Sequence, residues 1–249
     1  MVFREPKYLS AMDRAQLELT EDVFVSASGS IIDKLDAFTK FVSRRTLAKF
    51  LVRYEIFKKI IEVNGSIIEC GVMNGAGIFT YAHLSSIFEP VNHTRKIVGF
   101  DTFEGFPSVH EKDTGTGISS HLESGGLAGS SLEDLQRAVE LFDSNRTLAH
   151  IPKIELVKGD ITKTAPEYLQ NNPHLVVALL YLDLDLYEPT KAALKTFLPR
   201  MPKGAIVVFD ELNTQTFPGE TLAVDEVLGI SNVKIERLPL DPYVSYCIL

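Results

Sequence analysis

Four acidic side chains follow two apolar segments that lie close together in the sequence. Asp183 and Asp185 follow the first segment, and Asp210 and Glu211 follow the second. If the segments are adjacent parallel strands, their carboxyl ends meet and the four carboxylates gather at one edge of a sheet. Such crowding raises the pKa of the acids or requires a cation, and oxygen ligands favour Mg²⁺, Mn²⁺ or Ca²⁺ over zinc. The alternative is that the acids cap the following helices, Asp185 above all.

A glycine-rich turn precedes these acids in the chain. Residues 69–77 read Glu-Cys-Gly-Val-Met-Asn-Gly-Ala-Gly, a G-x-x-x-G-x-G spacing that differs from the G-x-G-x-x-G of dinucleotide sites. Gly71 and Gly75 let the backbone turn sharply and approach a ligand closely. S-adenosylmethionine has no pyrophosphate, and its amino-acid end lies along such a loop, so the spacing favours this cofactor. A tight turn without a ligand is the alternative.

Two further acids occur where a nucleotide-type ligand would be contacted. Asp101 ends the next apolar segment, where an acid accepts hydrogen bonds from ribose hydroxyls. Asp160 follows a third segment, where it either contacts the adenine amino group or caps a helix. The expected cofactor site comprises Glu69, Gly71, Gly75, Asp101, Thr102, Asp160 and Asp183.

Seven short apolar segments beyond Gly65 alternate with helical patterns. Most are continuously apolar, as parallel strands covered on both faces are, so the alternation predicts a doubly wound α/β fold. Only 239–242 separates the last two segments, which must therefore form a C-terminal antiparallel hairpin. Such a seven-stranded sheet is that of the Rossmann-like class I methyltransferases. The expected strands are 66–70, 96–100, 154–158, 176–182, 205–209, 233–238 and 243–248, and the expected helices are 77–88, 131–142, 189–198 and 221–228.

The remaining sequence predicts an N-terminal helical cap and a cytoplasmic protein. Apolar residues recur every three or four positions over 38–61, so 1–62 is predicted to be a helical segment or lid and 63–249 the methyltransferase domain. The net charge of −8 disfavours a nucleic-acid partner. The sequence shows neither a signal peptide nor an apolar run of membrane length, and Cys70 and Cys247 are expected to be buried, reduced thiols.

Five motifs of the chain resemble those of the macrocin O-methyltransferase family, which methylates deoxysugar hydroxyls. The resemblance implies that Asp183, Asp210 and Glu211 hold Mg²⁺ (or Mn²⁺) and that Asp185 is the general base. Many relatives carry two Asp where this chain has Asp210-Glu211. It further implies a sugar or sugar-nucleotide substrate and, since relatives often self-associate, a homo-oligomer. The motifs are Glu69-Cys-Gly-Val with Gly75, Asp101-Thr-Phe-Glu-Gly-Phe-Pro107, Tyr181-Leu-Asp-Leu-Asp-Leu-Tyr187, Phe209-Asp-Glu211 and Pro218-Gly-Glu-Thr-Leu-Ala-Val-Asp-Glu226.

Three other functions are weighed against this one. A catechol-type methyltransferase shares the sheet and the acids but favours Trp and Met walls, whereas this chain has no Trp and four Met. The glycine order and the hairpin disfavour a nicotinamide-dependent sugar dehydrogenase. A non-catalytic binding module would have no use for the carboxylates. Arg44 and Arg53 are weak candidates for contacting a diphosphate, and His110 and His121 for a second base, although solvated surface positions explain all four.

Overall fold

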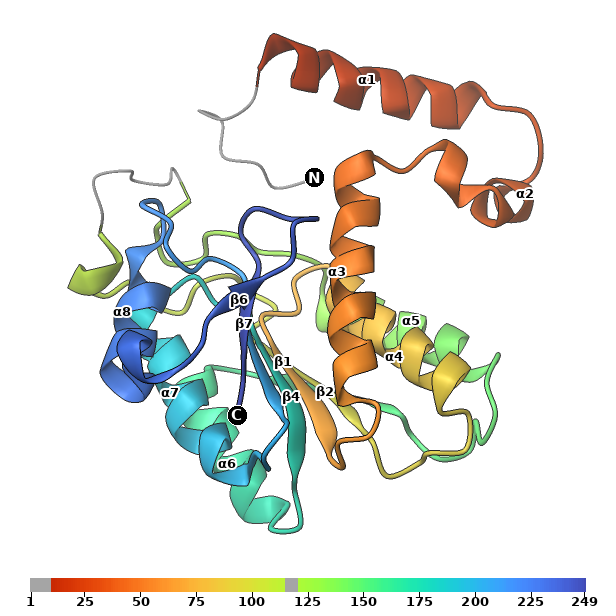
Figure 1. Ribbon diagram of the computed structural model, residues 1–249. Coiled ribbons are helices and arrows are strands. Elements are labelled where there is room, and N and C mark those ends of the chain that lie inside the picture. Colours follow the sequence, from red (N-terminus) through yellow and green to blue (C-terminus); the bar gives the residue numbers. More distant parts are fainter. Residues whose placement is uncertain (1–9, 115–120) are drawn as a thin grey trace. The chain divides into compact units, whose positions relative to one another are not determined.

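The computed structural model describes residues 10–114 and 121–249, and the chain divides into two compact units, Met1–Lys49 and Phe50–Leu249. The first unit contains α1 (Ala11–Ser26) and α2 (Ile31–Asp36), drawn in red and orange in Figure 1. Each of these helices begins with a capping box, and neither contains a buried residue. The 3₁₀ helix η2 (Phe38–Lys40) follows. Weak apolar periodicity concealed α1 and α2 in the sequence, where only a helical segment in general was expected.

Helix α3 (Arg44–Ile60) begins later than the expected range 38–61, because the first residues of that range form η2. The Oγ atom of Ser43 accepts a hydrogen bond from the Thr46 amide at 3.1 Å, which caps the helix. All buried residues of α3 belong to the second unit, and the division between the units falls inside this helix, between Lys49 and Phe50. The predicted lid boundary at residue 62 stays a prediction. The buried residues of α3 are Val52, Arg53, Ile56, Phe57 and Ile60.

The second unit is built on the expected seven-stranded sheet, in the order β3-β2-β1-β4-β5-β7-β6. Strand β7 is antiparallel to both β5 and β6, so the predicted C-terminal hairpin is confirmed. The other pairs are parallel. Strand β6 has two residues where six were expected. The strands are β1 (Ser66–Cys70), β2 (Ile97–Asp101), β3 (Ile154–Lys158), β4 (Val177–Leu182), β5 (Ile206–Phe209), β6 (Glu236–Arg237) and β7 (Ser245–Ile248).

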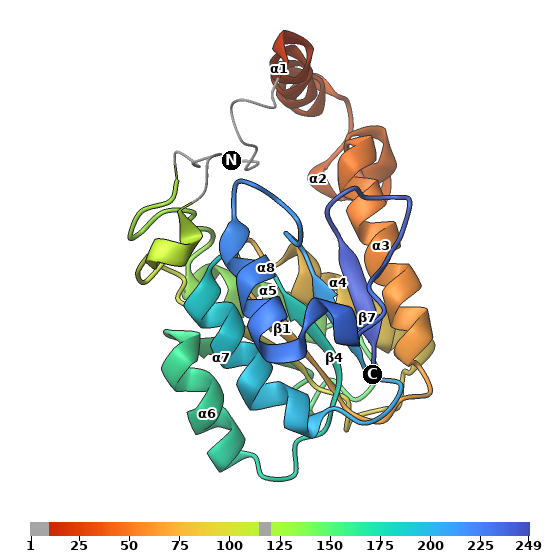
Figure 2. The same cartoon turned by 60° about the vertical axis from the view of Figure 1, so that its left-hand side comes forward.

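Helices cover both faces of this sheet (Figure 2). Helices α3, α4 (Ala76–Phe88) and α5 (Leu132–Asp143) pack on one face, and α6 (Ile161–Asn171), α7 (Tyr187–Phe197) and α8 (Pro218–Leu228) pack on the other. Helix α6 was not predicted. Short 3₁₀ helices occur at η3 (Glu111–Asp113), η4 (Leu198–Arg200) and η5 (Ile230–Asn232). The two cysteines are free and buried, as expected.

The carboxyl edge of the sheet is where the strand order reverses, because β1 lies between β2 and β4. Ligands of open α/β sheets bind at such a switch point. Backbone hydrogen bonds between neighbouring strands continue here beyond the ends of the strands. The Gly71 amide donates to the Phe100 carbonyl (2.9 Å), the Asp183 amide to the Cys70 carbonyl (2.8 Å) and the Asp210 amide to the Leu182 carbonyl (3.0 Å).

Candidate active site

The predicted carboxylates follow the neighbouring strands β4 and β5. Leu182 and Phe209 are register partners, and the next residues, Asp183 and Asp210, therefore occupy equivalent positions past the two strands. Asp210 is buried (2% exposed). Asp185 lies between β4 and α7 with φ +62°, a left-handed conformation that non-glycine residues seldom adopt and that occurs often at functional sites.

A fifth carboxylate, Glu220 in the first turn of α8, joins this group. Its side chain is 0% exposed, and its Oε1 atom accepts a hydrogen bond from the Glu211 amide at 3.0 Å. Burial, reinforced by the negative charges of Asp210, Glu211 and Asp185, raises the pKa of Glu220 well above its usual range. The carboxyl groups of α8 and of the two strands therefore lie close enough to repel one another.

These acids match the donor chemistry of a hard divalent cation, since each offers carboxylate oxygens. In residues 10–114 and 121–249, however, no group of three or more His, Cys, Asp or Glu side chains is arranged as a complete metal site. Asp183, Asp210 and Glu211 are thus brought to one edge of the sheet without forming a closed set of ligands. The chemistry of the donors fits a metal ion, and their assignment to one stays a prediction.

Glu69, at the penultimate position of β1, is buried rather than open to the loop (1% exposed). Its carboxyl lies beside the first turn of α4, because a Cβ atom at Gly77 would collide with Glu69 Oε1. Burial raises the pKa of Glu69 to about 8, although the positive charge of Arg53 opposes the shift. Arg53 is itself buried, so the solvated face expected from the sequence is wrong for this residue, and the diphosphate contact stays a prediction.

The cofactor loop has the backbone that its glycines predicted. Gly71 has φ +93°, and a Cβ atom there would collide with the Asp183 carbonyl, so the loop lies directly against the end of β4. Gly75 has φ +80° and is the N-cap of α4. Asp101 accepts hydrogen bonds at Oδ2 from the amides of Val72 (2.7 Å) and Met73 (2.9 Å), which fixes the loop against β2.

Asp101, Thr102 and Asp160 make hydrogen bonds within the chain, and their predicted contacts with the cofactor stay predictions. Asp101 Oδ1 accepts a bond from the Phe103 amide, but a carboxylate has about four acceptor positions, so a ribose hydroxyl is compatible with these bonds. Thr102 Oγ1 donates to the Gly105 carbonyl at 2.5 Å. Asp160 is the N-cap of α6, accepting from the Thr162 amide at 3.0 Å, so the capping alternative is present in the structure.

Part of the Gly/Ser-rich stretch 108–130 is fastened beside the site. Asp113 Oδ1 accepts a hydrogen bond from the Tyr187 amide at 2.7 Å. Lys112 Nζ donates to the Tyr187 hydroxyl at 2.8 Å, and that hydroxyl contacts Glu226. His110 lies against the Tyr187 ring, with ring centroids 5.2 Å apart. Residues 115–120 of this stretch lie outside the described residues.

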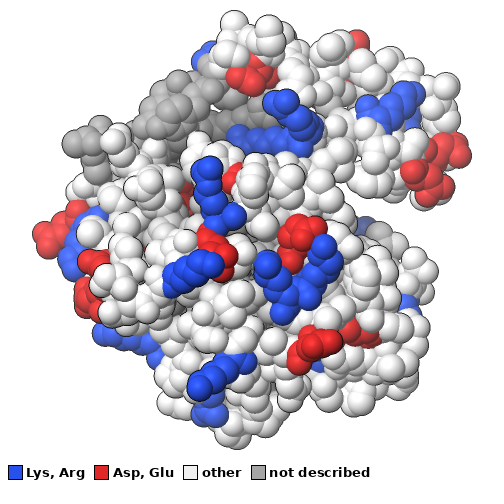
Figure 3. All heavy atoms as spheres, in the orientation of Figure 1, with Lys and Arg blue, Asp and Glu red and all other residues white. Residues whose placement is uncertain are grey.

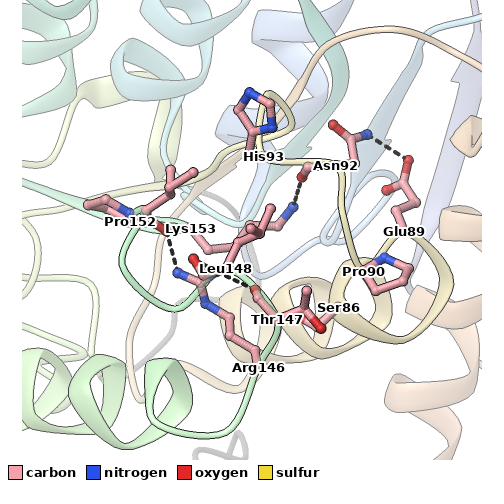
Figure 4. A pocket seen from close by; sticks show the side chains of 11 residues that line it. Ser86, Glu89, Pro90, Asn92, His93, Arg146, Thr147, Leu148, Pro152 and Lys153 are labelled. Carbon is pink, nitrogen blue, oxygen red and sulfur yellow. Dashed lines mark hydrogen bonds between the residues drawn. The ribbon is translucent and has the colours of Figure 1, made fainter.

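A small cavity elsewhere in the unit is separate from this edge (Figure 4). Its lining comes from the C-terminal end of α4 and the segments leading into β2 and β3, and therefore belongs to the opposite edge of the sheet. The free volume of about 10 Å³ holds about one water molecule. Lys153 Nζ donates to the Asn92 carbonyl at 2.7 Å, and Arg146 to the carbonyls of Leu148 and Ile151, so both cations serve the local backbone.

The distribution of charged side chains on the surface and the apolarity of the helices bear on the kind of partner. On the face seen in Figure 3, basic and acidic side chains are interspersed rather than separated into broad areas of one sign. Among the helices of residues 10–114 and 121–249, none combines the length and apolarity needed to cross a membrane.

Two buried residues at the site, Tyr181 and Glu220, received no role from the sequence, and Arg53 received only that of a weak candidate for a diphosphate contact. Tyr181 donates a hydrogen bond to Asp210 Oδ1 at 2.6 Å, Arg53 lies over the Tyr181 ring, and Glu220 accepts from the Glu211 amide. Tyr181 and Glu220 belong to recognised motifs. Tyr181 is also a polar residue within an apolar segment, and that contrast is the signal that could have identified it.

Solved structures contain close counterparts of this fold. The crystal structure of CalS11, a calicheamicin methyltransferase, matches with a TM-score of 0.92 at 31% identity, covering 100% of this chain and 97% of that chain. The apo structure of CalS11, described as a TDP-rhamnose 3'-O-methyltransferase, gives 0.84 at 30% identity, covering 97% and 96%. NovP, an O-methyltransferase, shares the fold with a TM-score of 0.63 at 24% identity, over 81% and 79% of the two chains. The molecule has the Rossmann-like fold of class I methyltransferases.

The family model described as macrocin-O-methyltransferase (TylF) matches residues 37–235. The chain therefore belongs to the macrocin O-methyltransferase family, as its motifs predicted. A relative from Streptomyces olivaceus, 8-demethyl-8-(2,3-dimethoxy-alpha-L-rhamnosyl)-tetracenomycin-C 4'-O-methyltransferase, is 29% identical over 163 residues. The match covers 60% of this chain and 53% of the relative, so the chain spans about half the length of that protein.

Proposed function

We propose that this protein is a Mg²⁺-dependent O-methyltransferase that moves a methyl group from S-adenosylmethionine to a hydroxyl of a deoxysugar. The observation that carries the proposal is the gathering of carboxylates from β4, β5 and α8 beside the glycine loop, at the switch point of the sheet. A rhamnose unit is named in the description of the CalS11 structure and in that of the Streptomyces olivaceus relative. These names favour a rhamnose-like acceptor, either nucleotide-linked or attached to an aglycone.

The cofactor would lie along the loop that starts at Gly71, and it supplies an electrophilic methyl group on a sulfonium. Because the loop backbone rests on the Asp183 carbonyl, the donor would be bound directly beside the carboxylates of β4 and β5. Asp101 would serve the ribose in addition to holding the loop amides, and Asp160 would serve the adenine. Glu69, Gly75, Thr102 and Asp183 complete the proposed site.

Asp183, Asp210 and Glu211 would provide the oxygen ligands of the cation. Held by these residues, a divalent ion would supply Lewis-acid chemistry, lowering the pKa of the substrate hydroxyl and fixing its direction. Asp185 lies next to these ligands in the chain, and its carboxylate would accept the hydroxyl proton as general base. Its left-handed backbone places it between the end of β4 and the start of α7, immediately beside the carboxyl edge.

The test is methyl transfer to dTDP-rhamnose and related dTDP-deoxysugars, measured in EDTA and after Mg²⁺ is restored. We expect turnover only with the metal, and a fall of about 100-fold or more for Asp183→Asn and for Asp185→Asn. Asp185→Asn should still bind S-adenosylhomocysteine and Mg²⁺ in calorimetry, because a general base is not a ligand of either. Asp134→Asn, an exposed carboxylate on α5, is the control and should match the wild type. Full turnover in EDTA, or by Asp183→Asn at saturating Mg²⁺, would contradict the proposal.

A further inference from the structure

A buried tyrosine and a buried arginine lie behind the proposed metal ligand Asp210. Tyr181 is the penultimate residue of β4 (1% exposed), and Arg53 comes from α3 (6% exposed). The guanidinium carbon of Arg53 lies 5.1 Å from the centroid of the Tyr181 ring, within the range of a cation–π contact. About one helical turn past the division between the units, α3 therefore places a cation on the sheet face that leads to the carboxylates.

The Tyr181 hydroxyl reaches Asp210 along that face. Tyr181 pairs in register with Val208, and Asp210 follows Val208 by two residues, so all three side chains point to the same face of the sheet. The hydroxyl donates to Asp210 Oδ1 at 2.6 Å, which is the length of a hydrogen bond to a carboxylate. The bond holds the Asp210 side chain in one orientation.

Burying the charged guanidinium of Arg53 costs desolvation free energy, which favourable contacts in the protein must offset. Burial opposes the charged form of Arg53, but neighbouring acidic groups, Asp210 among them, favour it, and the pKa of Arg53 is raised overall. In the described part of the chain, Arg53 Nε has no hydrogen-bond partner. Arg53 is thus held by the Tyr181 ring and by the nearby negative charge of Asp210.

We propose that Tyr181 is a positioning residue for the metal ligand Asp210 and that Arg53 acts through Tyr181 by fixing its ring. The phenol holds the Asp210 carboxylate at Oδ1 and so fixes the group that would bind the metal. The inference rests on the proposed function, since it concerns the ligand set named there. Hydrogen bonds that neighbouring side chains make to a metal ligand typically contribute about 10- to 100-fold to metal affinity.

The chain offers a matched control in Tyr81, a second tyrosine buried against the same core. The rings of Tyr81 and Tyr181 have centroids 6.1 Å apart, and the Tyr81 hydroxyl has no hydrogen-bond partner within the described residues. Tyr181→Phe and Tyr81→Phe remove the same atom from the same environment. Only the first removes a bond to Asp210, so any general effect of losing a buried hydroxyl appears in both variants.

The experiment is calorimetric titration of the full chain with Mg²⁺ and with Mn²⁺, in the presence of S-adenosylhomocysteine. We expect Tyr181→Phe to raise the metal Kd about 10-fold or more, with the Kd of S-adenosylhomocysteine in EDTA unchanged within about twofold. Tyr81→Phe should bind metal as the wild type does. In kinetics, Tyr181→Phe should raise the Mg²⁺ concentration at half-maximal rate while kcat at saturating Mg²⁺ stays within about threefold of the wild type.

Arg53→Met, combined with Tyr181→Phe in a double-mutant cycle, tests whether Arg53 acts on metal binding through Tyr181. We expect the single variant to raise the metal Kd a few fold, and the double variant with Tyr181→Phe to be no weaker than Tyr181→Phe alone. Additive effects would overturn the assignment of Arg53. Equal metal affinity of Tyr181→Phe and Tyr81→Phe would overturn that of Tyr181 while leaving the proposed function intact. If the wild type binds no metal, the proposed function fails and the positioning role fails with it.

Discussion

The carboxyl of Glu69 shows how a single buried acid makes the stability of this unit depend on pH. It lies beside the first turn of α4, and burial raises its pKa from 4.5 to about 8. Between these values the folded protein holds a proton that the unfolded chain releases. The contribution of Glu69 to stability is therefore complete below pH 4.5 and is lost as the pH rises through about 8.

Replacing this acid tests that pH dependence. Glu69→Gln cannot titrate, so the stability of the wild type relative to Glu69→Gln should decrease by about 1 kcal/mol or more between pH 5 and pH 8. Urea denaturation at pH 5, 6.5 and 8 measures the difference. The exposed Glu62→Gln serves as control and should show a difference that varies little with pH. A difference independent of pH for Glu69→Gln would contradict the buried, raised pKa.

At the scale of single residues, the sequence identified the acids at the edge of the sheet but not the residues that contact and orient them. Asp183, Asp210 and Glu211 could be expected at one edge because each directly follows an apolar strand. The roles of Tyr181 and Arg53 depend on how α3 packs against β4, and that of Glu220 depends on how α8 packs against β5. Such contacts join segments far apart in the chain, and the local pattern of residue types carries no information about them.

Helix α7 shows how one element can be capped by another. Its own N-cap residue, Leu186, provides no side-chain hydrogen bond. The missing acceptor comes from Asp113 in η3, whose carboxylate also accepts from the His110 amide at 2.8 Å. Asp113 also fits tightly against α8, since a Cβ atom at Gly219 would collide with its Oδ1. One carboxylate thus joins η3, α7 and α8 just beyond Asp185.

Removing this cap should weaken the start of α7. Asp113→Ala leaves the buried Tyr187 amide without its acceptor, and we expect a loss of about 1–2 kcal/mol in the free energy of unfolding, measured with urea. Proteolytic cleavage near η3 should become faster. The neighbouring exposed Glu111→Ala should change neither quantity appreciably. An Asp113→Ala protein as stable as Glu111→Ala would show that η3 does not cap α7.

Among the elements, apolar runs predicted the strands well and the helices less well. Strands β1, β2, β4 and β5 are buried along most of their length and are largely apolar, and even the edge strand β3, which is partly exposed, has the expected bounds; all five fall within two residues of the expected ones. Helix α6 was missed because it contains Pro166, which normally interrupts a helix, and buries only Ile161 and Ala165. Strand β6 is short because it pairs with β7 through Glu236 and Arg237 alone in the described sheet.

At the scale of the whole molecule, α3 belongs to both units. Its buried residues begin at Val52, and Ser43 caps its first turn, whereas α1 and α2 bury no residue. We therefore expect the stability of the second unit to depend on α3 but not on the helices before it. The N-terminal unit falls within residues 1–62, which the sequence predicted as a helical segment or lid.

Deleting residues 1–42, which keeps the Ser43 cap, should separate folding from sugar methylation. We expect the Tm to change by no more than about 3 °C and S-adenosylhomocysteine binding to be retained, because the sheet and its edge are untouched. Methyl transfer to dTDP-rhamnose should fall at least tenfold if these residues act as the lid. Scanning calorimetry and the transfer assay measure the two effects. Loss of cofactor binding would place part of the cofactor site in the deleted segment, and full activity would rule out the lid.

The hydrogen bonds that continue past the strand ends have a consequence for binding. The peptide groups of Gly71, Asp183 and Asp210 are tied across β2, β1, β4 and β5 before any ligand arrives. The backbone that carries the loop and the carboxylates is thus preorganised, and its loss of conformational entropy occurs once, on folding. Ligand binding then has to order side chains and little of the main chain, so more of the contact energy is expressed as affinity.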